Sequence, residues 1–456
     1  MSISHRFGCD PCARQGRRAF LLRGDPEGRD NGIVRSCVHV LRGTRFRVRA
    51  FVRTVPWARA AIPLVMGVLS ILLTQSSSAA DSRSEVQPRI RVRIAHQAAV
   101  LRFHGVDIAV VDAFTRLPLL PGPVDEVDVE AKGGRLVVNR LPLSAKRIRV
   151  ETPAVFVQMG RRDYRGAIEV VLASDGLTAV VHTVLEHYLY GAVASEMPAT
   201  WPAEALKAQA IVSRTYALRR MMESADRLYD VVDDVADQLY EGADDAFQAV
   251  RAVRGTTGIV LTKGDALLDA RFHSTCGGMT EVPGLVWPKA TMDLPAVRCE
   301  DCRASPVHDW RTSFSGDELA SLLAPEGFGD PRVEAVDVAE RSASGRAVMV
   351  AVRGKDARLL LRGNDFRRRL GYARLKSTRF TINHRDGLFE FRGQGYGHGV
   401  GLCQWGARGK ARRGMNVSAI LRAYFPGARF GRLASQGGRW RIIPYSFVQT
   451  SLTDGW

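Results

Sequence analysis

Glu196 stands at the end of a predicted helix and on the apolar face of that helix. The segment 191–202 reads GAVASEMPATWP, and Glu196 follows Leu189 and Val193 at spacings of seven and three residues, which puts the three side chains on one helical face. Pro198 should end the helix near Glu196, where the helix macrodipole is negative. Desolvation and this dipole both disfavour the ionised carboxylate, so we expect a raised pKa and a carboxylic acid able to act as a general acid. The alternative is a glutamate that forms a salt bridge at a helix end.

Four soft metal ligands occur as two short-spaced pairs. His273-x2-Cys276 is followed after 22 residues by Cys299-x2-Cys302. This arrangement predicts a tetrahedral Cys3His zinc site, with a structural Zn²⁺ because all four positions are filled. His308 is the alternative histidine ligand in place of His273. An exported protein also permits a disulfide, and a Cys299–Cys302 bond that leaves Cys276 free is the alternative.

The segment GQGYGHGVGLCQW (393–405) has glycine at every second position from Gly393 to Gly401. The residues between these glycines are Gln394, Tyr396, His398 and Val400. If the segment is an extended strand, glycine covers one face, which often marks close approach by a ligand or by another backbone. Aromatic and amide side chains suit a sugar ring, so a ligand surface and a tight strand crossing in the core are the two readings. Cys403 is interpreted as a small buried residue rather than a nucleophile.

The elements that must position these residues change character along the chain. Residues 89–175 alternate apolar and polar side chains over short runs, which predicts a β-rich scaffold. Helical spacing then predicts one helix that ends near 195–196 and a second over 203–222. The acidic stretch 226–245 is interpreted as a helix and loop on the surface. Further strands are expected within 255–275, 333–361 and 380–401, and further helices within 315–323, 365–370 and 407–425.

The net charge of +18 is divided between two parts of the 456-residue chain. Residues 1–59 contain 13 Arg, no Lys and 4 acidic residues, and so carry half of that charge. The apolar run 60–73 is short for a spanning helix but suits a signal-peptide core, and small residues at 78–80 suit cleavage after it. We therefore expect export, with an uncleaved anchor as the alternative. Residues 1–50 would come from a start set too early or form a disordered cytoplasmic extension.

Three blocks of the sequence together strongly resemble the stage II sporulation protein D (SpoIID) family. The blocks are VLEHYLYGAVASEMPATWPAEALKAQAIVSRTYAL (184–218), FHSTCGGMTE (272–281) and GQGYGHGVGLCQWGARGKARRGMNVSAILRAYFPGA (393–428). They occur in the order found in the family, and the resemblance covers roughly 89–430. Together with the predicted elements, it implies an α+β fold with a β-rich N-terminal region, a mixed helical and β catalytic region, and a groove between lobes.

The resemblance implies a lytic transglycosylase that cleaves peptidoglycan glycan strands, typically strands without stem peptides. The family's catalytic glutamate corresponds to Glu196, and the glycine–histidine block implies substrate-binding roles for Tyr396, His398 and Gln404. The HSTxGG block faces the same groove and adds Ser274, and some members bind zinc near it. Glu196 would protonate the oxygen between N-acetylmuramic acid and N-acetylglucosamine, after which the C6 hydroxyl of the same muramic ring closes a 1,6-anhydro end.

These expectations divide the chain and define its surroundings. The expected parts are a basic extension (1–59), a signal peptide (60–80), a β-rich region (85–178), a SpoIID-like catalytic domain (179–430) and a C-terminal tail (431–456). The expected location is the periplasm or cell wall, with glycan strands as partner, an amidase or other wall enzyme as a further partner, and the membrane only if the signal is uncleaved. Basic charge also suits nucleic acid, but export argues against it. The alternatives are a non-catalytic wall-binding enhancer of an amidase and a glycan hydrolase that uses water.

Overall fold

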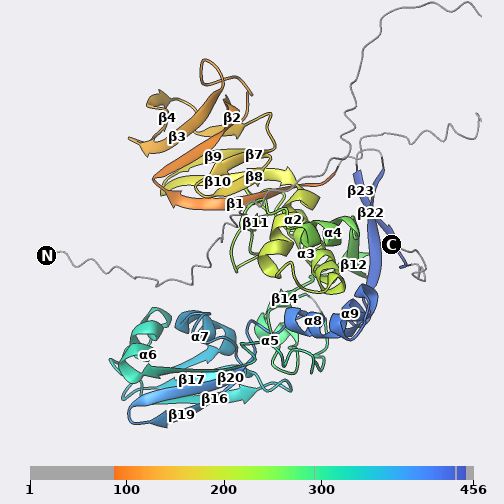
Figure 1. The fold of residues 1–456 in the computed structure, drawn as a ribbon. Coiled ribbons are helices and arrows are strands. Elements are labelled where there is room, and N and C mark those ends of the chain that lie inside the picture. Colours follow the sequence, from red (N-terminus) through yellow and green to blue (C-terminus); the bar gives the residue numbers. More distant parts are fainter. Residues whose placement is uncertain (1–86, 292, 437–438, 448–456) are drawn as a thin grey trace, which may run out of the picture. The chain divides into compact units, whose positions relative to one another are not determined.

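The computed structural model describes residues 87–291, 293–436 and 439–447. The expected basic extension and signal peptide, residues 1–59 and 60–80, lie outside the described residues. Within the described ranges, no helix is both long enough and apolar enough to cross a membrane. A run of ten strands comes first along the described chain, and a mixture of helices and strands follows it, which confirms the predicted α+β class (Figure 1).

The N-terminal region is built from strands, as the alternating pattern predicted. Ten strands join β11 (Val231–Val232) in one sheet of the order β11-β1-β10-β9-β6-β2-β3-β4-β5, with β7 paired to β2 and to β8. Ile90 and Val92 of β1 and Phe103 of β2 are buried in its core, because alternate side chains of a strand share one face. The strands are β1 (Arg89–Ala98), β2 (Val100–Asp112), β3 (Val124–Lys132), β4 (Arg135–Val138), β5 (Leu141–Leu143), β6 (Arg147–Glu151), β7 (Phe156–Met159), β8 (Arg162–Arg165), β9 (Ala167–Ala173) and β10 (Gly176–Val184).

Two helices follow the sheet and carry the first sequence block. β10 runs past the expected boundary at 178–179 and leads directly into α2 (Leu185–Glu196). The helix ends where the sequence predicted, because Met197 is extended, with φ −135° and ψ 133°, and Pro198 follows it. The second helix, α3 (Ala203–Glu223), begins directly after Pro202, as predicted.

A buried ion pair fixes α2 against α3. Nε and Nη2 of Arg214 each donate to one carboxylate oxygen of Glu186 at 2.7 Å, and Arg214 is fully buried. Arg214 Nη1 also donates to the carbonyl of Ile259 at 3.1 Å, which adds the start of strand β12 (Ile259–Lys263) to the same contact. Removal of one partner from such a pair typically costs about 3–5 kcal/mol, because the other charge stays buried without compensation. The ion pair therefore fixes the position of α2, the helix that ends with Glu196, relative to α3 and to the strand that begins at Ile259.

A small sheet and three short helices complete this core. The sheet has the order β13-β12-β22-β23, so the described part of the expected C-terminal tail belongs to the same sheet as β12. The predicted helical stretch 407–425 forms two helices, and the second begins at Asn416, whose Oδ1 accepts from Ala419 N at 2.9 Å. The elements are α4 (Phe247–Arg254), β12 (Ile259–Lys263), β13 (Ala266–Leu267), α8 (Gln404–Arg412), α9 (Val417–Tyr424), β22 (Arg429–Gln436) and β23 (Arg439–Pro444).

Residues 309–394 form two three-stranded sheets with their own aromatic core. Phe314, Phe366, Phe389 and Phe391 are buried there and separate from the main core. The strand orders are β15-β20-β19 and β16-β17-β18, and α6 and α7 lie beside these sheets (Figure 1). The elements are β15 (Asp309–Ser315), α6 (Gly316–Leu323), η1 (Ala324–Glu326), β16 (Ala335–Arg341), β17 (Ala347–Arg353), β18 (Arg358–Arg362), α7 (Gly363–Leu370), β19 (Phe380–Arg385) and β20 (Leu388–Gln394).

The acidic stretch 226–245 differs from the sequence interpretation of a helix and loop on the surface. It contains the short strand β11 and irregular backbone, and it has no helix. Gln238 and Tyr240 are fully buried although aspartates surround them in the sequence. The buried side chains hold this segment against α2 and α3, so it belongs to the core around Glu196.

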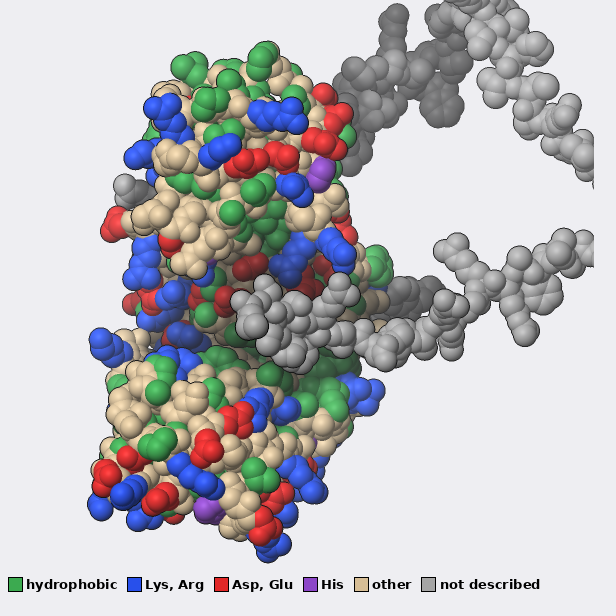
Figure 2. All heavy atoms as spheres, turned by 90° about the vertical axis from the view of Figure 1, so that its left-hand side faces the viewer, with side chains coloured by type: hydrophobic (Ala, Val, Ile, Leu, Met, Phe, Trp, Pro, Cys, Tyr) green, Lys and Arg blue, Asp and Glu red, His purple; other side chains and the backbone are tan. Residues whose placement is uncertain are grey.

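Charged side chains of both signs are interspersed over the face shown in Figure 2. The Lys and Arg side chains on that face do not gather into one stripe.

Candidate active site

Glu196 is held between two hydrogen-bond donors from distant parts of the chain. Its side chain is half-buried at the end of α2. Leu239 N donates to Oε1 at 2.8 Å, and Gln404 Nε2 donates to Oε2 at 3.1 Å. Burial raises the pKa of Glu196 and is the largest influence on it, while the two hydrogen bonds act in the opposite direction. The raised pKa is the direction that the sequence predicted, and it favours a carboxylic acid that can donate a proton.

The segment 238–240 supplies a contact that the sequence analysis missed. Tyr188 Oη donates to Gln238 Oε1 at 3.1 Å, and Gln238 Nε2 donates to Ser213 O at 3.3 Å. The rings of Tyr188 and Tyr240 lie 5.0 Å apart. These contacts hold the Leu239 N–H toward Glu196. In the sequence, Gln238 and Tyr240 on either side of Leu239 interrupt an acidic run, and this interruption was the signal that could have indicated a buried segment.

Gln404 is the predicted binding residue that the structure places against Glu196. It is the first residue of α8 and is buried. The neighbouring Trp405 packs edge-to-face on Trp201, with ring centroids 5.0 Å apart, and the Arg408 guanidinium lies 4.7 Å from the Trp405 ring. Trp201 and Trp405 are each half-buried. Trp201 follows Glu196 by five residues and Trp405 follows Gln404 directly, and no sequence pattern pointed to these two aromatic rings.

The glycine segment is not the extended strand that the sequence predicted. β20 ends at Gln394, and Gly395, Gly397, Gly399 and Gly401 have φ values of 83°, 113°, 88° and 74°. Only glycine adopts this left-handed region without cost. A Cβ at Gly395 would lie 2.6 Å from Thr275 O, and one at Gly397 would lie 2.7 Å from His273 Cβ. The chain's own segments therefore occupy the space beside these glycines, and close core packing is the correct interpretation of the glycine face.

The other predicted binding residues lie on this segment and its neighbour, without a hydrogen bond to Glu196 among the described residues. Tyr396 pairs through its backbone with Thr275, and the carbonyl of Ser274 accepts from Trp405 N at 3.1 Å. His398 packs on Trp287 with ring centroids 4.8 Å apart, and its Nδ1 accepts from Val400 N at 3.0 Å. Burial lowers the pKa of His398 well below its ordinary range, so its imidazole is neutral.

The cysteines come together with a fourth residue that differs from the prediction. The sulfurs of Cys276, Cys299, Cys302 and Cys403 all lie within 4.8 Å of one another, and all four thiols are buried and free. His273 does not belong to this cluster of described ligand atoms. Its Nδ1 lies 3.0 Å from Val400 O, and its buried Nε2 has no hydrogen-bond partner in the described chain. Strand pairing explains the exchange: β14 (Phe272–His273) runs parallel to β21 (Leu402–Cys403), which brings Cys403 beside the HSTC block. The substitute ligand His308 faces Asp309, with Nδ1 2.8 Å from Oδ2.

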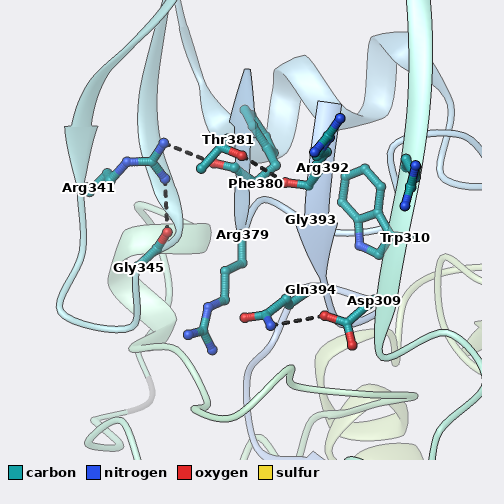
Figure 3. A pocket seen from close by; sticks show the side chains of 11 residues that line it. Asp309, Trp310, Arg341, Gly345, Arg379, Phe380, Thr381, Arg392, Gly393 and Gln394 are labelled. Carbon is teal, nitrogen blue, oxygen red and sulfur yellow. Dashed lines mark hydrogen bonds between the residues drawn. The ribbon is translucent and has the colours of Figure 1, made fainter. Parts of the chain in front are cut away.

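A pocket of about 580 Å³ opens beside the start of the glycine segment (Figure 3). Four arginines line it, together with one acidic residue, Asp309, which accepts from Gln394 Nε2 at 3.0 Å. The arginines are Arg311, Arg341, Arg379 and Arg392. An adjoining pocket shares Asp309, Arg379 and Gln394 and reaches Gly277 of the HSTCGG block. The excess of guanidinium groups favours an anionic ligand.

The comparisons with known proteins give consistent matches over this region. A family model described as "Stage II sporulation protein" matches residues 173–262, and one described as "Domain of unknown function (DUF8618)" matches residues 298–401. An uncharacterized protein of Brachyspira hyodysenteriae is 31% identical over 294 residues, which are 64% of this chain and 78% of that protein. Stage II sporulation protein D of Bacillus amyloliquefaciens is 32% identical over 265 residues, 55% of this chain and 74% of that protein. The amidase enhancer of Bacillus subtilis is 27% identical over 288 residues, 52% of this chain and 39% of that protein.

The Gln404 contact predicts how the pKa of Glu196 responds to substitution. Gln404→Leu removes a donor that stabilises the carboxylate, so the pKa of Glu196 should rise further. A carboxyl-carbon NMR titration measures it, with the Glu196 signal assigned by its absence in Glu196→Gln. The matched control is Gln394→Leu, whose amide contacts Asp309 instead and which should leave the pKa of Glu196 unchanged. A lowered pKa of Glu196 in Gln404→Leu would contradict the described contact.

Proposed function

Because the chain belongs to the stage II sporulation protein D family and therefore has a cell-wall-related function, we propose that it is an exported lytic transglycosylase. It would cleave the bond between N-acetylmuramic acid and N-acetylglucosamine in glycan strands and leave 1,6-anhydro ends. The observation that carries this proposal is a half-buried carboxyl group, Glu196, with a raised pKa between two hydrogen-bond donors.

Glu196 acts first as the acid. In its protonated form it donates to the glycosidic oxygen, and the bond from this oxygen to the muramic anomeric carbon breaks through an oxocarbenium-like transition state. The new carboxylate is stabilised where it forms, because Leu239 N–H and the Gln404 amide already point at its two oxygens. The same donors hold the carboxyl group in one orientation.

Glu196 then acts as the base. It takes the proton from the C6 hydroxyl of the same muramic ring, and that oxygen bonds to the anomeric carbon. Glycosidases that use water or a covalent intermediate need a second carboxylate near the first. In this proposal the nucleophile is a hydroxyl of the substrate itself, so Glu196 serves as both acid and base while the same two donors hold it.

Two features suit the binding of a sugar chain. Trp201 and Trp405 are half-buried rings beside the Glu196–Gln404 contact, and an aromatic face suits the apolar face of a sugar ring. The arginine-lined pocket suits carboxylates. In strands stripped of stem peptides, each muramic residue has a free lactyl carboxylate, whereas a stem peptide converts that group to an amide. The pocket therefore supports stripped strands as the preferred substrate.

The second candidate function is a non-catalytic wall-binding protein that enhances an amidase. One relative that matches over about half of this chain is named amidase enhancer, which favours keeping this candidate. The two functions give different products when purified strands are incubated with the protein alone, because an enhancer leaves the glycan bonds intact. Export is part of both proposals, since the glycan strands and the wall amidase both lie outside the cytoplasm.

Glu196→Gln should abolish formation of anhydro ends. The amide keeps the size of the side chain but cannot donate the proton, and general acid–base catalysis typically contributes about 10²–10⁴-fold. Stripped strands are digested and the products weighed by mass spectrometry, with Glu223→Gln at the exposed end of α3 as the matched control. Undiminished anhydro products from Glu196→Gln would contradict the assignment. Reducing ends from the wild type would indicate a hydrolase, and uncut strands with a stimulated amidase would indicate the enhancer.

Removal of pocket charges should weaken binding of stripped strands. Arg311 and Arg392 are exposed lining residues, so Arg311→Gln/Arg392→Gln should fold normally. Two exposed ion pairs are worth about 0.4–2 kcal/mol together, so KM should rise roughly 2- to 30-fold with kcat unchanged. Arg358→Gln removes an exposed arginine of β18 outside the pocket and is the control. An equal KM for stripped and peptide-bearing strands in the wild type would argue against the carboxylate role.

A further inference from the structure

The four-cysteine cluster has the dimensions of a tetrahedral metal site. Its sulfurs lie within 4.8 Å of one another, and those of Cys276 and Cys302 are 3.5 Å apart. Four sulfurs bound to one Zn²⁺ at about 2.3 Å are separated from each other by roughly 3.8 Å. Three separate segments contribute these residues: the HSTC block, the Cys299-x2-Cys302 pair and the start of α8. A convergence of four buried sulfurs from three segments is the closed ligand set of a structural zinc site.

Hydrogen-bond donors face the sulfur of Cys403. The N–H groups of Cys276 and Gly406 point at this sulfur, with N···S distances of 3.2 and 3.3 Å. Cys403 is also the N-cap of α8, so its sulfur lies at the positive end of that helix. The sulfur of Cys299 lies 3.0 Å from the hydroxyl of Tyr424, a contact in which either atom can be the donor. Donors aimed at sulfur stabilise a thiolate, which is the form that binds metal.

A buried guanidinium group lies beside the cluster and forms no salt bridge with a described carboxylate. Arg346 is 1% exposed and donates through Nη2 to the carbonyl of Cys276 at 2.6 Å. Its Nε and Nη1 have no hydrogen-bond partner in the described chain, and Arg346 forms no ion pair with a described carboxylate. A buried charge without compensation is strongly unfavourable. The buried carboxylate of Glu281 acts on Arg346 without a salt bridge, and four thiolates around a divalent ion, with a net charge of −2, would add negative charge next to Arg346.

We propose that Cys276, Cys299, Cys302 and Cys403 bind one Zn²⁺ as a structural ion. Two disulfides would also satisfy four cysteines, but each needs a sulfur–sulfur bond of about 2.05 Å, and neutral disulfides would add no negative charge beside Arg346. The four sulfurs fill a tetrahedral shell, so the ion holds no position for substrate. The site differs from the Cys3His set expected from local spacing, because Cys403 takes the place of His273.

The metal site would position the catalytic region. Cys403 directly precedes Gln404, whose amide contacts Glu196, so a zinc–sulfur bond at Cys403 fixes the start of α8 and the direction of that amide. Ser274 and Thr275, which contact Trp405 and Tyr396 through their backbones, lie next to the ligand Cys276. This positioning role rests on the proposed function, whereas the metal site itself does not.

Metal analysis of the full-length protein tests the site. Mass spectrometry of the metal content should find about one zinc per wild-type chain and about one in His273→Gln. Loss of outer-shell partners alone typically weakens a metal site 10- to 100-fold, so Cys403→Ser should lower the zinc affinity by at least about 100-fold in competition with a chromophoric chelator. Circular dichroism shows whether each variant is folded. Co²⁺ in place of Zn²⁺ should give thiolate-to-cobalt charge-transfer bands in the wild type and His273→Gln, and weakened bands in Cys403→Ser.

Several outcomes would overturn this inference. They are a wild-type chain with no bound metal, four cysteines recovered as two disulfides, iron in place of zinc, and loss of zinc in His273→Gln but not in Cys403→Ser. The positioning role has a separate readout: removal of zinc from the folded protein should lower strand cleavage and change the pKa of Glu196. Zinc bound as expected in a protein that cleaves no strands would uphold the metal site and contradict the proposed enzyme.

Discussion

The structure around the candidate site depends on one desolvated carboxyl group. Glu196 lies at the end of α2, where burial raises its pKa, and the Leu239 N–H and the Gln404 amide limit that rise while fixing its orientation. These donors come from positions 43 and 208 residues farther along the chain. No local element can produce that geometry, so the fold must bring three segments together. The buried pair of Glu186 and Arg214 sets α2 for this purpose.

The second constraint is the approach of the glycine segment to the HSTC block. Glycines in the left-handed region let the backbone from 395 to 401 pass against residues 271–276 without side chains between them. This close approach pairs β14 with β21 and places Cys403 beside Cys276. Gln404 begins α8 at the next residue. The same packing therefore assembles the cysteine cluster and delivers the amide to Glu196.

The sequence predicted well what depends on local periodicity. Apolar spacing and proline positions located the end of α2 and the start of α3, and placed Glu196 where burial raises its pKa. The alternation of apolar and polar side chains predicted the β-rich N-terminal region, because it is also a local periodicity. Composition was a poorer guide: the acidic run 226–245 contains the buried residues Gln238 and Tyr240, whose environment is set by α2 and α3 and cannot be read from the run itself.

Two further differences come from ambiguities in pattern. Glycine at every second position fits a strand with one bare face, but it equally fits a chain in which every second residue adopts positive φ. The fourth cysteine is 101 residues beyond Cys302, so spacing alone favoured the nearer His273. Trp201 and Trp405 were missed because each is unremarkable in its own segment, and only the fold joins them.

We propose that Glu196 activates an internal hydroxyl of the substrate and not water. Digestion of stripped glycan strands in water enriched in the heavy oxygen isotope tests it most directly, with the masses of the new ends as the readout. Attack by the internal hydroxyl should give ends that contain no heavy oxygen and are lighter than hydrolysed ends by one water molecule. New ends that incorporate heavy oxygen from the solvent would contradict it.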